Sequence, residues 1–459
     1  MREKIKIAVF GGSFDPFHMG HLNVVEGLIK LEKFDRIIVM PLGLAPHKDG
    51  YMTPAGYRYE MTRLALMDYP EVFLSDYEIN RPGKFSYTLD TIQYFEKEIK
   101  YNHVLKQQKK IRKKRKRRHK KNRRNQKQAS NDQEYVESIE KAIENLQIKV
   151  KLSLVYGSDA LDTIESWHEP ARLMQKATLW ICRRGNEDLQ HMEARAEYLR
   201  EKYQAKIKFF DIDETGYSGT EIRNEIKQDH YSKEALPKSV RKFIKKNQIY
   251  RFQADMEALG KENLITIAKY ENIVRKKVSR SRFIHSLNVM QYSVHLARSH
   301  NYDLMKAATT GILHDIAKPM KLDKQYKYAK KIGKLVPINK NIAHGPAGAY
   351  YISKNLNIKD PEILDALIFH TTSREDMTTL DKIIYLADKI EFGRNFENLD
   401  EIREIAEVDL DEAMRICLEE VRESLVRRKR KGHPSTKSAI NYINGLNNDQ
   451  ENKGENIEY

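Results

Sequence analysis

The sequence predicts two domains of different fold class: an α/β domain with a doubly wound parallel sheet, followed by an all-α domain. Short β-type segments alternate with helical patterns between residues 5 and 250, and such alternation is typical of parallel sheets. After about residue 252 the β-type segments stop and helical patterns follow one another. We therefore expect domains at 1–252 and 253–445, followed by a polar, disordered tail at 446–459.

Six segments rich in β-branched and aromatic residues define the expected strands. In chain order they read IKIAVF, RIIVMPL, EVFLSDYEI, KVKLSLVYG, ATLWICRR and AKIKFFDI. Apolar residues at helical spacing lie between these segments, at Leu22–Leu31, Arg58–Met67 and Thr88–Lys100. In the second domain the helical patterns cover Met256–Lys269, Arg282–Ser299, Leu304–Ile316, Gly345–Lys354, Pro361–His370, Leu380–Ile390 and Asp411–Arg427.

A strongly basic segment interrupts the first domain. The net charge is +17, but residues 100–127 hold 16 Lys and Arg and no acidic residue, which leaves +1 for the rest of the chain. The stretch 101–148 has too few apolar residues for a core, so we expect a flexible surface insertion with a short amphipathic helix at Glu134–Leu146. Because it lacks interleaved aromatic residues, it should bind nucleic acid weakly and without sequence preference. An RNA-associated factor is the alternative that this segment leaves open.

The composition is typical of a cytoplasmic protein. The 459 residues are 40% apolar, enough for two or three hydrophobic cores. No segment approaches the roughly 18 consecutive apolar residues of a transmembrane helix, and no secretory leader is recognisable. Cys182 and Cys417 provide no disulfide framework. We expect no association with a membrane.

The stretch GGSFDPFHMGH directly follows the first expected strand. Gly11 and Gly12 carry no side chain where the chain leaves the strand, so backbone N–H groups can approach a phosphate closely. The helix that follows directs its positive end to the same place. His18 and His21, three residues apart, lie on one face of its first turn and can donate hydrogen bonds to phosphoryl oxygens. The pattern indicates phosphoryl-transfer chemistry without a protein nucleophile.

A second helix start follows the last expected strand, in YSGTEIR. Ser218 can cap this helix while Glu221 reaches back to it, which forms a capping box. Together with Thr220 and Arg223, this helix N-terminus can bind triphosphate oxygens. Lys48, after the second strand, is a further candidate phosphate partner.

These motifs, with PLGLAPHK, FSYTLDT and YGSDALDTIESW in the same order, resemble bacterial nicotinate-nucleotide adenylyltransferases of the nucleotidylyltransferase superfamily. The resemblance implies a Rossmann-like sheet that joins ATP to nicotinate mononucleotide with Mg²⁺ and releases pyrophosphate. It implies ATP contacts from Gly11, Gly12, Ser13, Phe14, His18, His21, Ser218, Thr220 and Arg223. It also implies contacts to nicotinate mononucleotide from Lys48, Thr88, Gly157, Asp159 and Trp167, with the indole stacked on the pyridine ring.

The implied mechanism is an in-line attack by the phosphate of nicotinate mononucleotide on the α-phosphorus of ATP. The catalytic residues would be His18, His21, Lys48 and Arg223, which orient the substrates and stabilise developing charge. The basic insertion departs from the family, in which the TLDT helix leads directly to the next strand. Nicotinamide mononucleotide as the acceptor, or a relationship to the pantetheine-phosphate enzymes, is the alternative.

Histidines and aspartates recur in the second domain within apolar helical patterns. An adjacent pair, His314 and Asp315, stands in GILHDIAK, and burial of both without a partner would cost several kcal/mol. A metal ion removes that cost, since imidazole and carboxylate groups are good ligands for iron, manganese or zinc. Lys318, one turn after His314, can reach a bound phosphate from the same helix face.

This pattern resembles the HD superfamily of metal-dependent phosphohydrolases. His285, His314, Asp315 and Asp388 match its basic metal set, and His344 and His370 match the additional ligands of its two-metal members. The segments HGPAGA, FHTTS and LDKIIYLADKIEFGR resemble the bacterial HD enzymes that split diadenosine tetraphosphate into two ADP. The resemblance implies two divalent transition-metal ions, iron or manganese, with Asp315 and Lys318 as catalytic residues and Arg394 as a phosphate contact. A guanosine polyphosphate alarmone or a deoxynucleotide as substrate, or metal binding without catalysis, is the alternative.

Overall fold

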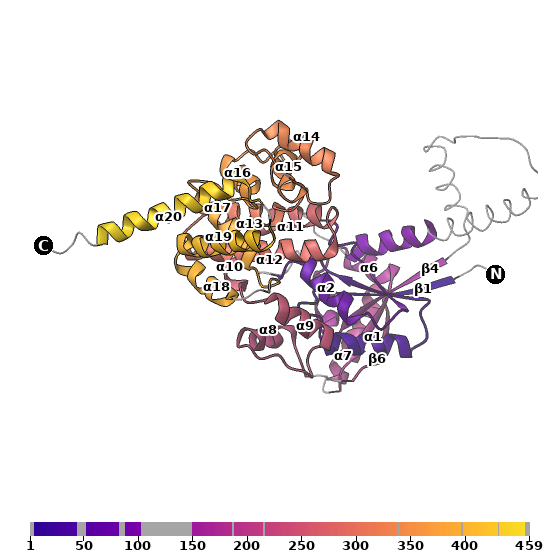
Figure 1. Cartoon of the computed structure of the whole chain (residues 1–459). Helices are drawn as coiled ribbons and strands as arrows, with labels where there is room; N and C mark the ends of the chain where they lie inside the picture. The colour runs from indigo at the N-terminus through magenta and orange to yellow at the C-terminus, as the bar shows by residue number, and fades with distance from the viewer. Residues whose placement is uncertain are drawn as a thin grey trace, which may run out of the picture. The chain divides into compact units, whose positions relative to one another are not determined.

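The computed structural model divides the chain into two compact units (Figure 1). It describes residues 4–43, 52–81, 88–101, 149–185, 188–213, 216–337, 339–395, 398–429 and 431–454. The first unit comprises Met1–Pro46, Met61–Ile222 and Tyr231–Pro237. The second comprises His47–Glu60, Arg223–His230 and Lys238–Tyr459. The basic insertion at 101–148, with the expected helix Glu134–Leu146, lies outside the described residues except for residue 101.

The first unit is built on a six-stranded parallel sheet, which confirms the predicted doubly wound α/β fold. The strands are β1 (Lys4–Gly12), β2 (Arg36–Pro41), β3 (Val72–Leu74), β4 (Lys149–Gly157), β5 (Thr178–Arg183) and β6 (Lys206–Asp211). Their order in the sheet is β3-β2-β1-β4-β5-β6. The chain winds outward in opposite directions from β1 and β4, so the topological switch point, where such sheets bind ligands, lies between these two strands.

Side chains that alternate along β1 face opposite sides of the sheet. Ile7 and Val9 join one hydrophobic cluster with the helix over residues 88–101 and with α5 (Asp159–Thr163), α6 (Pro170–Lys176) and α7 (Leu189–Tyr203). The other face is covered by α1 (Met19–Lys30), where a Cβ added to Gly27 would lie 3.2 Å from the ring of Phe210 on β6. Helices on both faces explain why the strands are continuously apolar.

The second unit is helical in all of its described elements, as predicted. Its helices are α9 (Lys238–Asn247), α10 (Gln253–Glu257), α11 (Lys261–Arg275), α12 (Arg280–Ser299), α13 (Leu304–Leu313), α14 (Leu322–Ile332), α15 (Lys340–Asn355), α16 (Pro361–Phe369), α17 (Thr379–Ile390), α18 (Leu399–Val408), α19 (Leu410–Arg427) and α20 (Pro434–Gly454). Two helices, α2 (Ala55–Ala65) and α8 (Gly219–Lys227), begin in one unit and end in the other. Helix α12 is largely buried and contacts α10, α11, α13, α17 and α18.

Two expected features of the second unit differ from the structure. The helix expected over Met256–Lys269 is interrupted at Gly260, whose φ of 76° is incompatible with a right-handed helix. Helix α20 continues to Gly454 and so includes the first part of the tail that the sequence predicts to be disordered from residue 446. Ala439 and Ile443 anchor α20 by burial, and extension of an existing helix costs little. None of the described helices has the length and apolar character needed to span a bilayer.

The close approach of α12 and α13 provides a test of the second unit's packing. A Cβ added to Gly311 would lie 2.8 Å from the Cα of Met290, so we expect Gly311→Ala to lower the stability of this unit by about 1–3 kcal/mol. The matched control is Gly445→Ala on α20, where a Cβ meets nothing within 4 Å and should be neutral or slightly stabilising. Differential scanning calorimetry measures both, and equal transition temperatures for the two variants would contradict the packing.

Candidate functional site

The first candidate site lies where β1 and β4 end. Gly12 ends β1, and a Cβ at this position would lie 2.7 Å from the ring of Phe14, so packing alone favours glycine here. Phe14 is fully buried, and any contact that it makes to ATP must therefore come from its backbone. The neighbouring Gly11 meets only Met40, at 3.9 Å. Ser13 is the residue that links Gly12 to Phe14.

The two histidines of the first motif lie together at the start of α1. The rings of His18 and His21 are 3.8 Å apart between centroids, and the backbone N–H of His18 donates to Nδ1 of His21 over 3.2 Å. In neutral His21 the proton is therefore on Nε2, from which it can be donated to a phosphoryl oxygen. His18 is 8% exposed, and its Nδ1 has no hydrogen-bond partner among the described residues. The structure thus brings the predicted pair to one point.

Burial lowers the pKa of His18 to about 4, and the nearby charge of Arg184 acts in the same direction. The imidazole is therefore neutral at pH 7. Arg184 follows β5 and was missed in the sequence, where it has no recognisable motif; only the adjacency of β4 and β5 brings it near the site.

The second predicted helix start forms the capping box that the sequence indicates. The backbone N–H of Ser218 donates to Oε2 of Glu221 over 3.0 Å, and the N–H of Glu221 donates to Oγ of Ser218 over 3.2 Å. The helix is α8, which follows β6 and thus begins at the carboxyl edge of the sheet. Thr220 lies in its first turn and Arg223 one turn later. Their contact with ATP stays a prediction.

The residues predicted for the pyridine nucleotide gather around the end of β4. The ring of Trp167 packs edge-on against Tyr156 at 5.0 Å, and the Tyr156 hydroxyl is hydrogen-bonded to Thr88. A Cβ at Gly157 would lie 2.8 Å from Oδ1 of Asp159, so the absence of a side chain allows this carboxylate to lie at the end of the strand. Lys48 lies outside the described residues.

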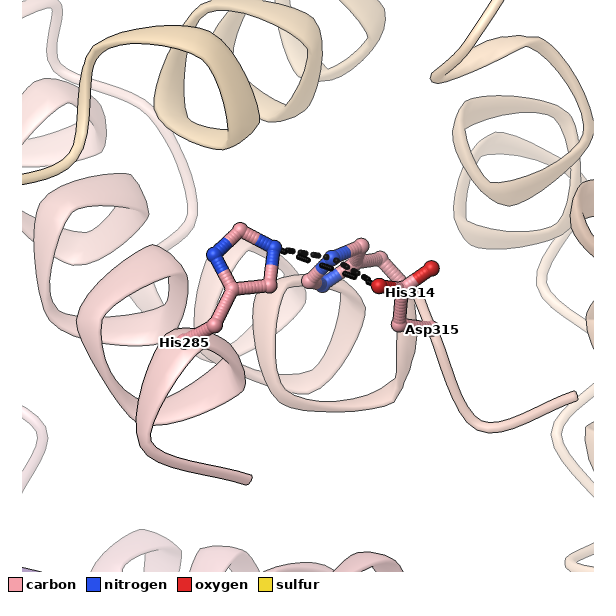
Figure 2. A group of neighbouring side chains, drawn as sticks. All are labelled: His285, His314 and Asp315. Atoms are coloured by element: carbon pink, nitrogen blue, oxygen red, sulfur yellow. Dashed lines mark hydrogen bonds and ion pairs between the residues drawn. The ribbon is translucent and has the colours of Figure 1, made fainter. Parts of the chain in front are cut away.

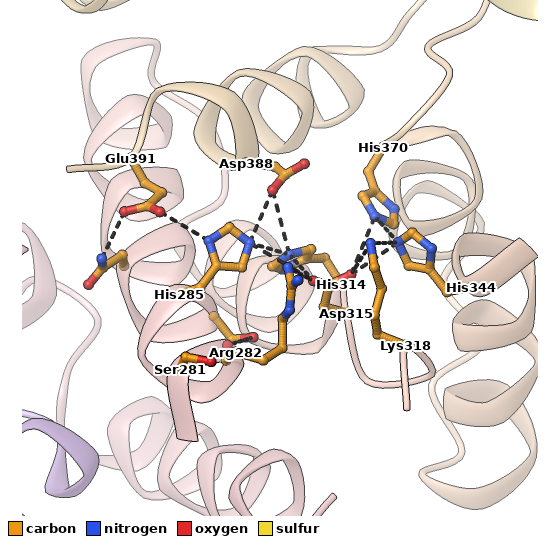
Figure 3. A network of polar contacts seen from close by, with 12 residues as sticks. Ser281, Arg282, His285, His314, Asp315, Lys318, His344, His370, Asp388 and Glu391 are labelled. Atoms are coloured by element: carbon orange, nitrogen blue, oxygen red, sulfur yellow. Dashed lines mark hydrogen bonds and ion pairs between the residues drawn. The ribbon is translucent and has the colours of Figure 1, made fainter. Parts of the chain in front are cut away.

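The second candidate site is a cluster of buried imidazoles and carboxylates in the helical unit. His285 comes from α12, His344 from α15 and Asp388 from α17. His314 and His370 are the residues directly after α13 and α16, and Asp315 follows His314. All six predicted metal ligands thus point into one interior space (Figure 3).

One part of the cluster surrounds Oδ2 of Asp315 (Figure 2). The Nε2 atoms of His285 and His314 are 3.2 Å apart, and they lie 3.9 Å and 3.5 Å from this oxygen. Oδ1 of Asp388 completes the group, 3.1 Å from Nε2 of His285. Four donor atoms at such separations can share one ion, since a metal bound to nitrogen or oxygen at about 2.1 Å places its ligands about 3 Å apart.

The other oxygen of Asp315 belongs to a second group (Figure 3). Its Oδ1 lies 3.0 Å from Nε2 of His344 and 4.0 Å from Nε2 of His370, and these two nitrogens are 3.0 Å apart. Asp315 therefore offers one oxygen to each of two neighbouring positions. This is the arrangement that a pair of metal ions bridged by a carboxylate requires.

Hydrogen bonds on the far side of the rings leave the Nε2 atoms available as ligands. Nδ1 of His314 donates to the carbonyl oxygen of Gly311, and Nδ1 of His370 donates to that of Leu367, each over 2.7 Å. Nδ1 of His285 lies 3.0 Å from Oε1 of Glu391. A donor at Nδ1 leaves the lone pair of the neutral ring on Nε2, which faces the cluster. The described residues therefore fit divalent metal ions.

Cationic side chains surround the carboxylates of the cluster. Arg282 donates to Oδ2 of Asp315 over 2.7 Å, and Nζ of Lys318 lies 3.6 Å from its Oδ1. Arg394 donates to Oδ1 of Asp388 over 2.7 Å and also to the Asp388 backbone carbonyl. Arg394 thus holds the side chain of Asp388 in place. Its contact to phosphate stays a prediction. Arg282 was missed in the sequence, although it stands one helical turn before His285.

The protonation states of Asp315, His344 and His370 fit ligand binding. Burial would raise the pKa of Asp315, but His314 and His344 beside it hold that pKa well below its usual value. Burial lowers the pKa of His344, and burial together with the neighbouring imidazoles lowers that of His370 well below its usual value. Burial also lowers the pKa of Lys318. At neutral pH the cluster therefore presents ionised carboxylates, and His344 and His370 are neutral imidazoles.

Two family models match the chain. Residues 9–225 match the cytidylyltransferase-like family, and residues 282–393 match the HD domain. A symmetrical bis(5'-nucleosyl)-tetraphosphatase of Bacillus subtilis is 34% identical over 173 residues, which are 37% of this chain and 93% of the relative.

Two further relatives align with the first domain and with most of the chain, respectively. A probable nicotinate-nucleotide adenylyltransferase of Clostridium beijerinckii is 28% identical over 54% of this chain and 99% of the relative. A Mycoplasma genitalium protein described as a probable nicotinate-nucleotide adenylyltransferase/Ap4A hydrolase is 23% identical over 91% of this chain and 98% of that relative. A single relative is thus similar to this chain across both domains.

The buried state of His18 can be measured directly. With its pKa lowered to about 4, we expect its imidazole to stay neutral as the pH falls from 7 to 5, and to take up a proton only near pH 4. Histidine-selective NMR on the full chain follows this titration, and the His18→Gln variant identifies the signal by its loss. A midpoint near 6.5, as for an exposed histidine, would contradict the buried site.

Proposed function

The chain belongs through its HD domain to the family of the symmetrical bis(5'-nucleosyl)-tetraphosphatases, and from this premise we propose that it is a bifunctional enzyme of adenylyl nucleotides. The domain at 1–252 would transfer an adenylyl group from ATP to nicotinate mononucleotide, a step of NAD biosynthesis. The domain at 253–445 would hydrolyse diadenosine tetraphosphate to two ADP. The Mycoplasma relative, similar over 91% of the chain, supports both activities together.

The observation that supports transfer is the His18–His21 pair at the start of α1, at the switch point of the sheet. The phosphate oxygen of nicotinate mononucleotide forms a bond to the α-phosphorus of ATP, and the bond to pyrophosphate breaks. The imidazoles and the helix N-termini would stabilise charge on the equatorial oxygens. Both described groups of metal-ligating side chains lie in the second unit, so Mg²⁺ would reach the transferase on the ATP phosphates.

The observation that supports hydrolysis is the carboxylate of Asp315 shared between two groups of imidazoles. His285, His314, Asp315 and Asp388 would hold one divalent ion, and Asp315, His344 and His370 a second, with iron or manganese as the proposed metals. Such ions supply Lewis-acid activation of water and phosphate when bound. Lys318 and Arg282, whose charged groups lie beside Asp315, would neutralise phosphoryl oxygens at the same place.

Steady-state kinetics test the transferase. We expect His18→Ala to lower kcat by about 10²–10³-fold with a smaller change in KM for ATP, because the imidazole acts where charge develops in the transition state. The assay follows pyrophosphate release from ATP with nicotinate mononucleotide, and His230→Ala, an exposed histidine near the end of α8, is the matched control. Faster turnover with nicotinamide mononucleotide or phosphopantetheine would reject the proposed acceptor.

Product analysis tests the hydrolase. With Mn²⁺ or Fe²⁺ we expect diadenosine tetraphosphate to give ADP alone, and we expect Asp315→Asn to lower the rate by at least about 100-fold, since even outer-shell changes cost 10–100-fold. Asp323→Asn, an exposed aspartate on α14, is the matched control. Anion exchange resolves the products after chelation and metal addition. AMP with ATP would contradict symmetrical cleavage, and cleavage of a guanosine polyphosphate in place of diadenosine tetraphosphate would favour the alternative substrate.

A further inference from the structure

A chain of buried hydrogen bonds leads away from His285, on the side opposite the metal-ligating atoms. Nδ1 of His285 lies 3.0 Å from Oε1 of Glu391, and Oε2 of Glu391 accepts from Nδ2 of Asn288 over 2.8 Å. Oδ1 of Asn288 in turn accepts from the hydroxyl of Tyr57 over 2.6 Å. The chain thus connects four side chains from α2, α12 and the end of α17.

Each link of this chain has a fixed direction. The amide group of Asn288 donates to Oε2 of Glu391 and, over 3.0 Å, to Oδ1 of Asn247. Its carbonyl oxygen accepts from the hydroxyl of Tyr57. The tyrosine hydroxyl therefore supplies the hydrogen bond that holds the carbonyl end of this amide in place. A flipped amide would place its oxygen against the Glu391 carboxylate and the Asn247 carbonyl oxygen, which is repulsive.

Because these side chains are buried, loss of one of their hydrogen bonds would be energetically costly. Tyr57 is 0% exposed, Glu391 2% and Asn288 6%. Water cannot readily replace a missing partner there, and an unsatisfied buried polar atom is destabilising. Gly393 packs closely against Glu391 and Asn288, and its N–H donates to Glu391. A Cβ on Gly393 would lie 2.8 Å from Oε2 of Glu391 and 3.1 Å from Nδ2 of Asn288.

We propose that Tyr57 is a positioning residue of the HD metal site, acting through Asn288 and Glu391 on His285. The carboxylate of Glu391 holds the proton of His285 on Nδ1, and in the neutral ring Nε2 then carries the lone pair and is directed at Asp388 and His314. Tyr57 lies outside the HD match and inside the cytidylyltransferase-like match, so a residue of the first sequence domain completes the outer shell of the second domain's metal site. This inference rests on the proposed metal site.

The test is the affinity of the full-length, metal-free protein for Mn²⁺, measured by calorimetry and by the EPR signal of free Mn²⁺. We expect Glu391→Gln to weaken binding by about 10–100-fold, and Tyr57→Phe, one link further out, by about 3–10-fold. In the double variant the two effects on Mn²⁺ affinity should not add, because both changes interrupt the same series of hydrogen bonds.

Tyr292→Phe is the matched control. Its ring is buried on α12, one turn after Asn288, and its hydroxyl has no hydrogen-bond partner among the described residues. Loss of that hydroxyl should leave Mn²⁺ affinity unchanged. Thermal unfolding of each variant separates a general loss of stability from a loss of affinity.

Two results would overturn the inference. Unchanged Mn²⁺ affinity in Tyr57→Phe, or additive effects in the double variant, would give Tyr57 a purely structural role while leaving the metal site intact. Absence of Mn²⁺ binding by the wild-type chain would instead reject the metal site itself and the positioning role with it.

Discussion

The buried carboxylate of Asp315 is the group on which the arrangement of the helical unit depends. It is 2% exposed, and an isolated charge at that depth would cost several kcal/mol. Arg282 compensates one oxygen directly, and imidazoles from four helices or helix ends surround both. The close packing of α13 on α12 at Gly311 brings Asp315 next to Arg282 and His285, which both lie on α12. The same glycine offers its carbonyl oxygen to His314, so helix packing and ring orientation depend on one position.

Helix ends orient several of the groups in both candidate sites. His314 and His370 both stand directly after a helix and donate from Nδ1 to a carbonyl three residues earlier, at Gly311 and Leu367. Carbonyls in the last turn of a helix have no partner within the helix, so each bond satisfies one of them and fixes a ring at the same time. In the first unit the same principle acts at helix starts, where α1 and α8 direct N–H groups to the carboxyl edge of the sheet.

The two candidate sites differ in the charges that their side chains must stabilise. The sheet edge must stabilise charge that appears briefly on phosphoryl oxygens, and neutral His18 with helix N-termini can do so without a permanent ion. The helical site holds two ionised carboxylates among imidazole nitrogens, a donor set that can bind divalent cations before any substrate arrives. Adenylyl transfer and hydrolysis of an adenylylated polyphosphate therefore have distinct structural requirements, although both substrates carry the same nucleotide.

The alternation of strands and helices, the capping box at Ser218 and the set of side chains around Asp315 could be inferred from the sequence, because each rests on local periodicity, on spacing within a turn or on a short motif. Arg282 was within reach of the same reasoning, since it stands one turn before His285. Only the tertiary structure decided that the two oxygens of Asp315 face different groups of imidazoles, that Arg394 holds Asp388, and that Tyr57 bonds to Asn288, 231 residues further along the chain. Burial and packing determine these contacts, and they join residues whose separation in the sequence carries no local signal.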